Sequence, residues 1–92
     1  MVVVEPRVDF DDEASSHSTL MQVVAQDVPG LLRALSLTLA AYGCNIEVAL
    51  VDTEGETAID VFYLTKEGSK LEAIEEEGLR SALVEALKAN VR

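Results

Sequence analysis

Apolar and polar residues alternate at the start of the chain, where one parity holds Val2, Val4, Val8 and Phe10. This period of two predicts a strand over residues 2–10 with one buried face. Pro6 interrupts the pattern. Because proline has no N–H to donate to a ladder, we expect this strand at a sheet edge. The acidic and serine-rich residues 11–16 then predict a polar connection.

A second strand and a first helix follow. Residues 17–26 form a β-rich run. One face of it holds Met21, Val23 and Ala25, and the other holds Leu20, Gln22 and Val24. Asp27 is a good N-cap and Pro29 suits a first helical turn, so a helix is expected to begin here. Apolar residues continue at helical spacing, at Val28, Leu32, Leu35, Leu39 and Tyr42. Gly43 is expected to end this helix as a left-handed C-cap.

The second half of the chain repeats the change from strands to helix. Two β-rich runs, residues 44–53 and 56–66, are separated by turn residues and predict a hairpin. Leucines at every fourth position predict a second helix over residues 72–90: Leu79, Leu83 and Leu87. Gly78 lies inside this helix and predicts a later start or a bend.

The element order is strand, strand, helix, strand, strand, helix, within one domain spanning residues 1–92. An α+β sandwich packs it economically, with a four-stranded antiparallel sheet and both helices on one face. Relative to the usual ferredoxin-like order, the last strand is missing and an extra strand stands at the front. A right-handed strand–helix–strand unit leaves an edge slot for that first strand. The predicted lateral order is first, second, fourth, third.

The sheet faces predict a partner. We expect Glu47 and Asp60 to point to solvent, and parity then places under the helices Ile46, Val48, Leu50, Ile59, Val61 and Tyr63. The opposite face still holds Leu20, Val24, Ala49, Val51, Phe62 and Leu64. So large an apolar surface usually marks an interface, which predicts a homodimer or a neighbouring domain. The alternative is that some strands bury their other face, since a one-residue shift exchanges every side chain.

Composition narrows the choice of partner and compartment. Seven basic against 17 acidic residues give a formal net charge of -10, which opposes binding to nucleic acid and to anionic membranes. Cys44 is the only cysteine, so no internal disulfide forms and a reducing cytoplasm is the expected compartment. The N-terminus does not have the pattern of a signal peptide, and no apolar run approaches the ~18 residues of a membrane span.

Chemistry-bearing residues are sparse. His17 and Cys44 are the only residues of their types and lie far apart in sequence, which predicts neither a zinc cluster nor a catalytic pair. The acidic run at residues 9–13 does not have the glycine-punctuated loop of calcium sites. We therefore expect no catalytic residue, no metal and no cofactor, and the chain is not expected to be an enzyme.

The segment at residues 26–32 is the best candidate for a binding site. It combines a strand end, a proline, a glycine and a helix start, whose unpaired N–H groups and dipole suit a carboxylate. Gly30 permits close approach of a ligand. Asp27 can accept a hydrogen bond from an amino group, although the alternative is that it only caps its own helix. Asn45 is expected near the same helix, where it either adds polar contacts or only shapes the turn.

These residues resemble the ACT domain family. The similarity is closest to the C-terminal ACT domains of bacterial uridylyltransferase/uridylyl-removing nitrogen sensors and to plant ACT-repeat proteins. It runs in order through residues 6–12, 19–23, 27–32, 43–46, 60–65 and 79–83. The resemblance implies an ACT-type ferredoxin-like fold, pairing of domains through sheet edges or faces, and a non-catalytic regulatory role.

The resemblance also implies an amino-acid effector, with glutamine first because those nitrogen sensors respond to it. Its contacts would fall on Asp27, Val28, Gly30, Leu31, Leu32, Asn45 and Ile46. These relatives commonly have arginine after the aspartate, where this chain has Val28, and that missing cation argues against direct carboxylate binding. The alternative function is a ligand-free interaction or dimerisation module.

Overall fold

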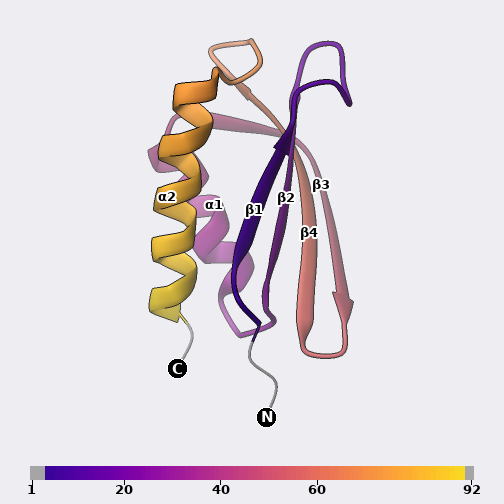
Figure 1. Cartoon of the computed structure of the whole chain (residues 1–92), viewed down its shortest axis with the longest axis vertical. Coiled ribbons are helices and arrows are strands. Elements are labelled where there is room, and N and C mark those ends of the chain that lie inside the picture. The colour runs from indigo at the N-terminus through magenta and orange to yellow at the C-terminus, as the bar shows by residue number, and fades with distance from the viewer. Residues whose placement is uncertain (1–3, 91–92) are drawn as a thin grey trace.

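Four strands and two helices make up the computed structural model, which describes residues 4–90. In chain order they are β1 (Arg7–Asp11), β2 (Thr19–Gln26), α1 (Leu31–Ala41), β3 (Cys44–Glu54), β4 (Thr57–Lys66) and α2 (Ala73–Asn90). The strands form one antiparallel sheet in the order β1-β2-β4-β3, which confirms the predicted lateral order. Both helices lie on the same side of the sheet (Figure 1). This is the α+β, ferredoxin-like arrangement of ACT type.

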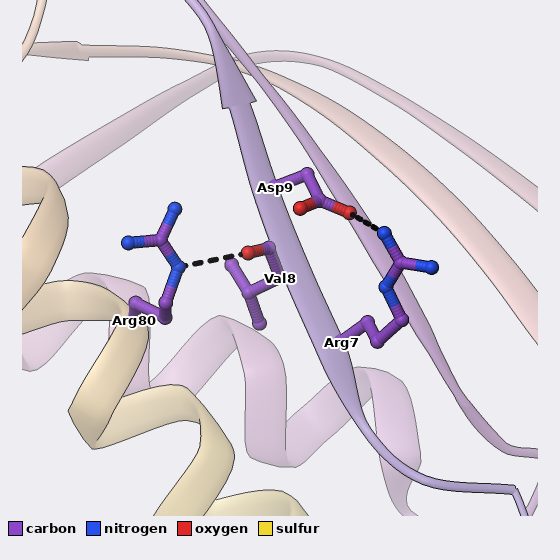
Figure 2. Close-up of polar contacts among 4 residues, drawn as sticks. All are labelled: Arg7, Val8, Asp9 and Arg80. Atoms are coloured by element: carbon purple, nitrogen blue, oxygen red, sulfur yellow. Dashed lines mark hydrogen bonds and ion pairs between the residues drawn. The ribbon is translucent and has the colours of Figure 1, made fainter.

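The edge strand β1 is shorter than expected. It begins only after Pro6, so the proline lies outside the ladder, and Val2 falls outside the described residues. Its inner side pairs with β2, with Val8 opposite Val23. On its outer side, Arg80 of α2 donates a hydrogen bond from Nε to the carbonyl oxygen of Val8 at 2.9 Å (Figure 2). The second helix therefore holds the outer edge of β1 in place.

The core uses the other face of β4 from the one expected. Cross-strand pairing places Phe62 opposite Met21 and Asp60 opposite Val23, on the side that carries the helices. Phe62 is 1% exposed and Asp60 is 2% exposed, so the prediction that Asp60 faces solvent and Phe62 the open face was wrong. The register with β2 decides the matter, because β4 carries apolar residues on both parities and either face can be buried.

The same correction applies to β3. Val48 and Leu50 lie opposite Tyr63 and Val61 on the open face, instead of under the helices. The register shifts between Ile46 and Val48, so Ile46 lies opposite the buried Leu64 on the helix side. Further along the strand, Ala49 and Val51 also face the helix side, opposite Phe62 and Asp60. The open face still carries partly exposed apolar side chains: Leu20, Val24, Val48, Leu50, Ile59, Val61 and Tyr63. The sequence thus correctly predicted that the open face is apolar, but it predicted the wrong residues for most of that face.

The first helix starts later than its sequence suggests. Gly30 is its N-cap, with φ of 82°, and Asp27 lies outside it. The buried face is made by Leu31, Leu35 and Leu39, whereas Leu32 is 44% exposed. The glycine at the other end behaves as predicted, since Gly43 is left-handed with φ of 79°. Proline and glycine together form the turn before the helix, which moves the first helical residue to Leu31.

The second helix runs without interruption from Ala73 to Asn90, and its three leucines are fully buried, as predicted. Gly78 does not break it. A Cβ atom at this position would lie 1.7 Å from Oη of Tyr42, so the glycine makes room for the tyrosine at the end of α1. Neither α1 nor α2, over the part of the chain described, is long and apolar enough to cross a membrane.

Candidate functional site

The N-terminus of α1 has no side-chain cap. Gly30 cannot supply one, and the first turn of the helix contains no acidic residue. The backbone N–H of Asp27 donates instead to the carbonyl oxygen of Glu56 at 2.9 Å, which ties the turn to the start of β4. The first N–H groups of a helix have no intrahelical partner and lie at its positive dipole end. This end of α1 therefore favours an anionic group.

A cavity of about 210 Å³ opens at this end of α1. Five of the predicted contact residues line it: Asp27, Val28, Gly30, Leu31 and Leu32. Two strands complete the wall with Val51, Thr53, Ala58 and Asp60. Its volume is about seven times the ~30 Å³ that a water molecule occupies in the liquid, so the cavity is of a size for a small metabolite.

The remaining two predicted contacts, Asn45 and Ile46, lie at the opposite end of the sheet. They pair with Thr65 and Leu64 at the end of β4, whereas the cavity lies beside the other end of the β3–β4 hairpin. Asn45 follows the C-terminal end of α1, and its Nδ2 donates to Oε2 of Glu47 at 3.3 Å. Within one copy of the chain, Asn45 therefore lies near the C-terminal end of this helix and away from the cavity at its start.

Asp60 is the charged residue among the four lining residues of this cavity that sequence reasoning missed. Its side chain is 2% exposed, and its Oδ1 atom is buried with no hydrogen-bond partner. Burial raises the pKa of this carboxyl group, and the charges of Asp27 and Asp52 raise it further, while a hydrogen bond from the Asp52 backbone acts in the opposite direction. Buried polar groups are nearly always paired, so an unpaired one beside a cavity suggests a place for a ligand.

A larger cavity, of about 550 Å³, lies at the other end of the sheet. Its lining includes His17, Glu47, Tyr63 and Thr65. Three of its polar lining residues already have partners, since Thr65 donates from Oγ1 to Glu47 at 2.8 Å and His17 Nδ1 contacts Ser16 at 3.1 Å. No buried unpaired atom belongs to the lining residues described. The smaller cavity is therefore the better candidate, although the larger one has more room.

A second perturbed carboxyl group lies at the start of α2 and lines neither cavity. The pKa of Glu76 is raised to about 7, first by burial and then by a side-chain hydrogen bond with Asp12 and the charge of that residue. Arg80 lowers this pKa and Glu77 raises it. Two carboxyl groups share a hydrogen bond only when one of them is protonated. In the contact between α2 and the loop before β2, the hydrogen bond between Glu76 and Asp12 therefore requires a proton, which is lost as the pH rises through about 7.

We expect the free energy of unfolding to fall as the pH rises through about 7, because the raised pKa of Glu76 means that the folded state binds the proton more tightly than the unfolded state. Glu76→Gln, which imitates the protonated form, should remove most of this fall while leaving stability at acidic pH close to that of the wild type. Urea unfolding across the pH range measures it. Glu85→Gln, on an exposed position of the same helix, is the control and should retain the pH dependence.

Comparisons with known proteins give the chain a set of relatives. No protein-family model matches it. It is 42% identical over 89 residues to the bifunctional uridylyltransferase/uridylyl-removing enzyme of Vibrio campbellii, which covers 96% of this chain and 10% of that protein. It is 42% identical over 86 residues to the enzyme of the same name from Phenylobacterium zucineum, covering 91% of this chain and 9% of that protein.

The corresponding enzyme of Caulobacter vibrioides is 38% identical over 89 residues, which cover 95% of this chain and 10% of that protein. The chain thus spans about a tenth of the length of the curated relatives it matches. This protein is accordingly homologous to a segment of about 90 residues in bifunctional uridylyltransferase/uridylyl-removing enzymes.

Proposed function

We propose that this chain is a non-catalytic, cytoplasmic regulatory module that binds a free amino acid, with glutamine as the first candidate, at the turn before α1. The observation that carries the proposal is the uncapped start of α1, which opens on a cavity lined by five residues of the turn. The backbone N–H groups of this helix end would hold the effector carboxylate. No arginine side chain is needed for that contact, which accommodates Val28 in the turn.

The relatives support a regulatory role. They carry two activities in one chain according to their names, and this segment corresponds to about a tenth of their length. A module of this size suits the control of activities housed elsewhere. The ACT-type fold and the resemblance of residues 27–32 to ACT turns favour an amino acid over other small metabolites.

A dimer would complete the site. β3 is an edge strand of 11 residues whose backbone has an unpaired side, and the side chains of residues 45–54 are exposed. Such an edge readily pairs with a second chain, and a two-fold axis makes the pairing antiparallel. Centred on the middle of β3, this pairing would place Asn45 of the second copy opposite Thr53, which lines the cavity. Both predicted groups of contact residues would then meet across the interface.

The alternative function is a ligand-free interaction module. The open sheet face supports it, because seven apolar side chains there remain partly exposed in a single copy. Under this alternative the protein would dimerise or dock a partner through that face, and the cavity at α1 would stay empty. A wild-type protein that dimerises but responds to none of the twenty amino acids would favour it.

The test is a calorimetry and thermal-unfolding screen of the twenty amino acids, in which a true ligand at 100 times its Kd stabilises the protein by about 2.7 kcal/mol. Leu32→Asp should abolish the response, because Leu32 lines the cavity and an added carboxylate would occupy the anion position at the start of α1. The variant should still fold, since Leu32 is 44% exposed.

Leu37→Asp is the matched control, because Leu37 is 56% exposed on the same helix and does not line this cavity. It should bind the effector as the wild type does. A wild-type protein that no amino acid stabilises would remove the proposed function, as would a Leu32→Asp variant that binds normally.

A further inference from the structure

The cavity at α1 has two ends of opposite electrostatic character. Towards α1 it is lined by Gly30, Leu31 and Leu32, at a helix start that has no side-chain cap and no acidic residue in its first turn. The N–H of Leu31 donates to the carbonyl oxygen of Val28 at 3.2 Å, so the N–H groups that follow it are the ones open to an anion. Towards the sheet it meets Asp60, a buried residue that is only 2% exposed. One end therefore suits a negative group and the other a positive group, within about 210 Å³.

Asp60 has no cation of its own. The two ion pairs among the described residues join Arg7 to Asp9 and Arg80 to Glu77, and none of these four residues lines the cavity. The charges that act on Asp60 from its neighbours are those of Asp27 at the turn and Asp52 on β3, and both are negative. A buried carboxylate without a paired cation is costly. Asp60 therefore lowers the stability of the free protein, and a cationic group that pairs with it would relieve this cost.

We propose that Asp60 is the recognition group for the ammonium of the effector, so that the cavity selects zwitterions, with their carboxylate at α1 and their ammonium at the sheet. This inference rests on the proposed function and adds to it a residue and a rule of selection. Carboxylic acids that have no α-amino group would leave Asp60 unpaired and bind weakly. Amines that have no carboxylate would leave the helix end empty.

Such a ligand would change the protonation of Asp60. Because burial raises the pKa of Asp60, part of the free protein carries a proton on this carboxyl group at acidic pH. Binding of an ammonium favours the ionised carboxylate, so the O–H bond breaks and the proton passes to the buffer. Affinity should therefore rise with pH while Asp60 titrates, with Asp27 and Asp52 as the other acidic groups around it.

The experiment compares wild type with Asp60→Asn, using L-glutamine and its analogue without the α-amino group, glutaramate, as probes after the twenty amino acids have been screened. Asp60→Asn should be at least as stable as the wild type, because it removes an unpaired buried charge while keeping the shape. It should bind glutamine at least tenfold more weakly and lose the rise of affinity with pH. Wild type should prefer glutamine to glutaramate at least tenfold, and the variant should show little preference.

The control is Asp52→Asn, which removes a neighbouring negative charge on β3 but leaves Asp60 in place. It should keep the preference for glutamine over glutaramate. If Asp60→Asn binds glutamine and discriminates glutaramate as the wild type does, the role of Asp60 is refuted while the amino-acid site at α1 stands. If wild type binds no amino acid in the screen, the proposed function and this inference fail together.

Discussion

Phe62→Ala is expected to reduce the free energy of unfolding by about 3–5 kcal/mol, the usual cost of truncating a buried phenylalanine to alanine. Phe62 is the largest of the fully buried side chains and is 1% exposed. It lies between Met21 of β2 and Ala49 of β3 on the helix side of the sheet. Since small domains are stable by only ~5–15 kcal/mol, this variant should be close to unfolding at 25 °C.

The adjacent residue supplies the control. Val61 lies on the open face and is partly exposed, so Val61→Ala should cost less than about 1 kcal/mol. Urea unfolding of both variants measures the difference. A larger loss of stability for Val61→Ala than for Phe62→Ala would mean that β4 buries the face of Val61 and exposes the face of Asp60 and Phe62. The description of the core would then be wrong.

Gly78→Ala is expected to destabilise the protein by about 2 kcal/mol, against the ordinary rule for helices. In a helix interior the change from glycine to alanine usually gains up to ~1 kcal/mol. Here the new Cβ would lie 1.7 Å from Oη and 2.9 Å from Cζ of Tyr42, so α1 and α2 would have to separate or the ring would have to move. Overpacking of this kind costs about 1–3 kcal/mol, and occasionally more.

A double-mutant cycle separates the clash from the helix propensity. In a Tyr42→Ala background the obstructing ring is gone, and Gly78→Ala should then be neutral or stabilising. Thermal and urea unfolding of the four proteins gives the coupling energy. If Gly78→Ala stabilises the wild type, α1 and α2 do not approach each other as closely as described.

Local signals in the sequence were sufficient for the order of elements. Turn residues, helical spacing and a left-handed glycine at Gly43 act within a few positions, so the elements were predictable. Their lateral order followed from the right-handedness of a strand–helix–strand unit. The buried face of β4 could not be predicted, because both faces of this strand carry apolar residues. Its pairing with β2 decides which face is buried. Gly78 was misinterpreted for a similar reason, since the tyrosine that needs its space belongs to the other helix.

The candidate site divides in the same way. The turn at residues 27–32 combines a proline and a glycine before a helix, and this local chemistry pointed to five of the residues that line the cavity. Asp60 was missed because its burial follows from the strand register, whereas its charge alone predicts a position facing solvent. The only sequence signal for it was the alternation of Ala58, Phe62 and Leu64 around it.

An amino-acid site at the start of α1 can be observed by following the backbone amide signals of isotopically labelled protein by NMR during a titration with L-glutamine. We predict shifts concentrated at residues 28–32 and at Val51, Thr53 and Asp60, around the cavity at the start of α1. Residues 15–18 at the other cavity should change little. No shift at saturating glutamine and the other amino acids, or shifts confined to the cavity near His17, would contradict an amino-acid site at α1.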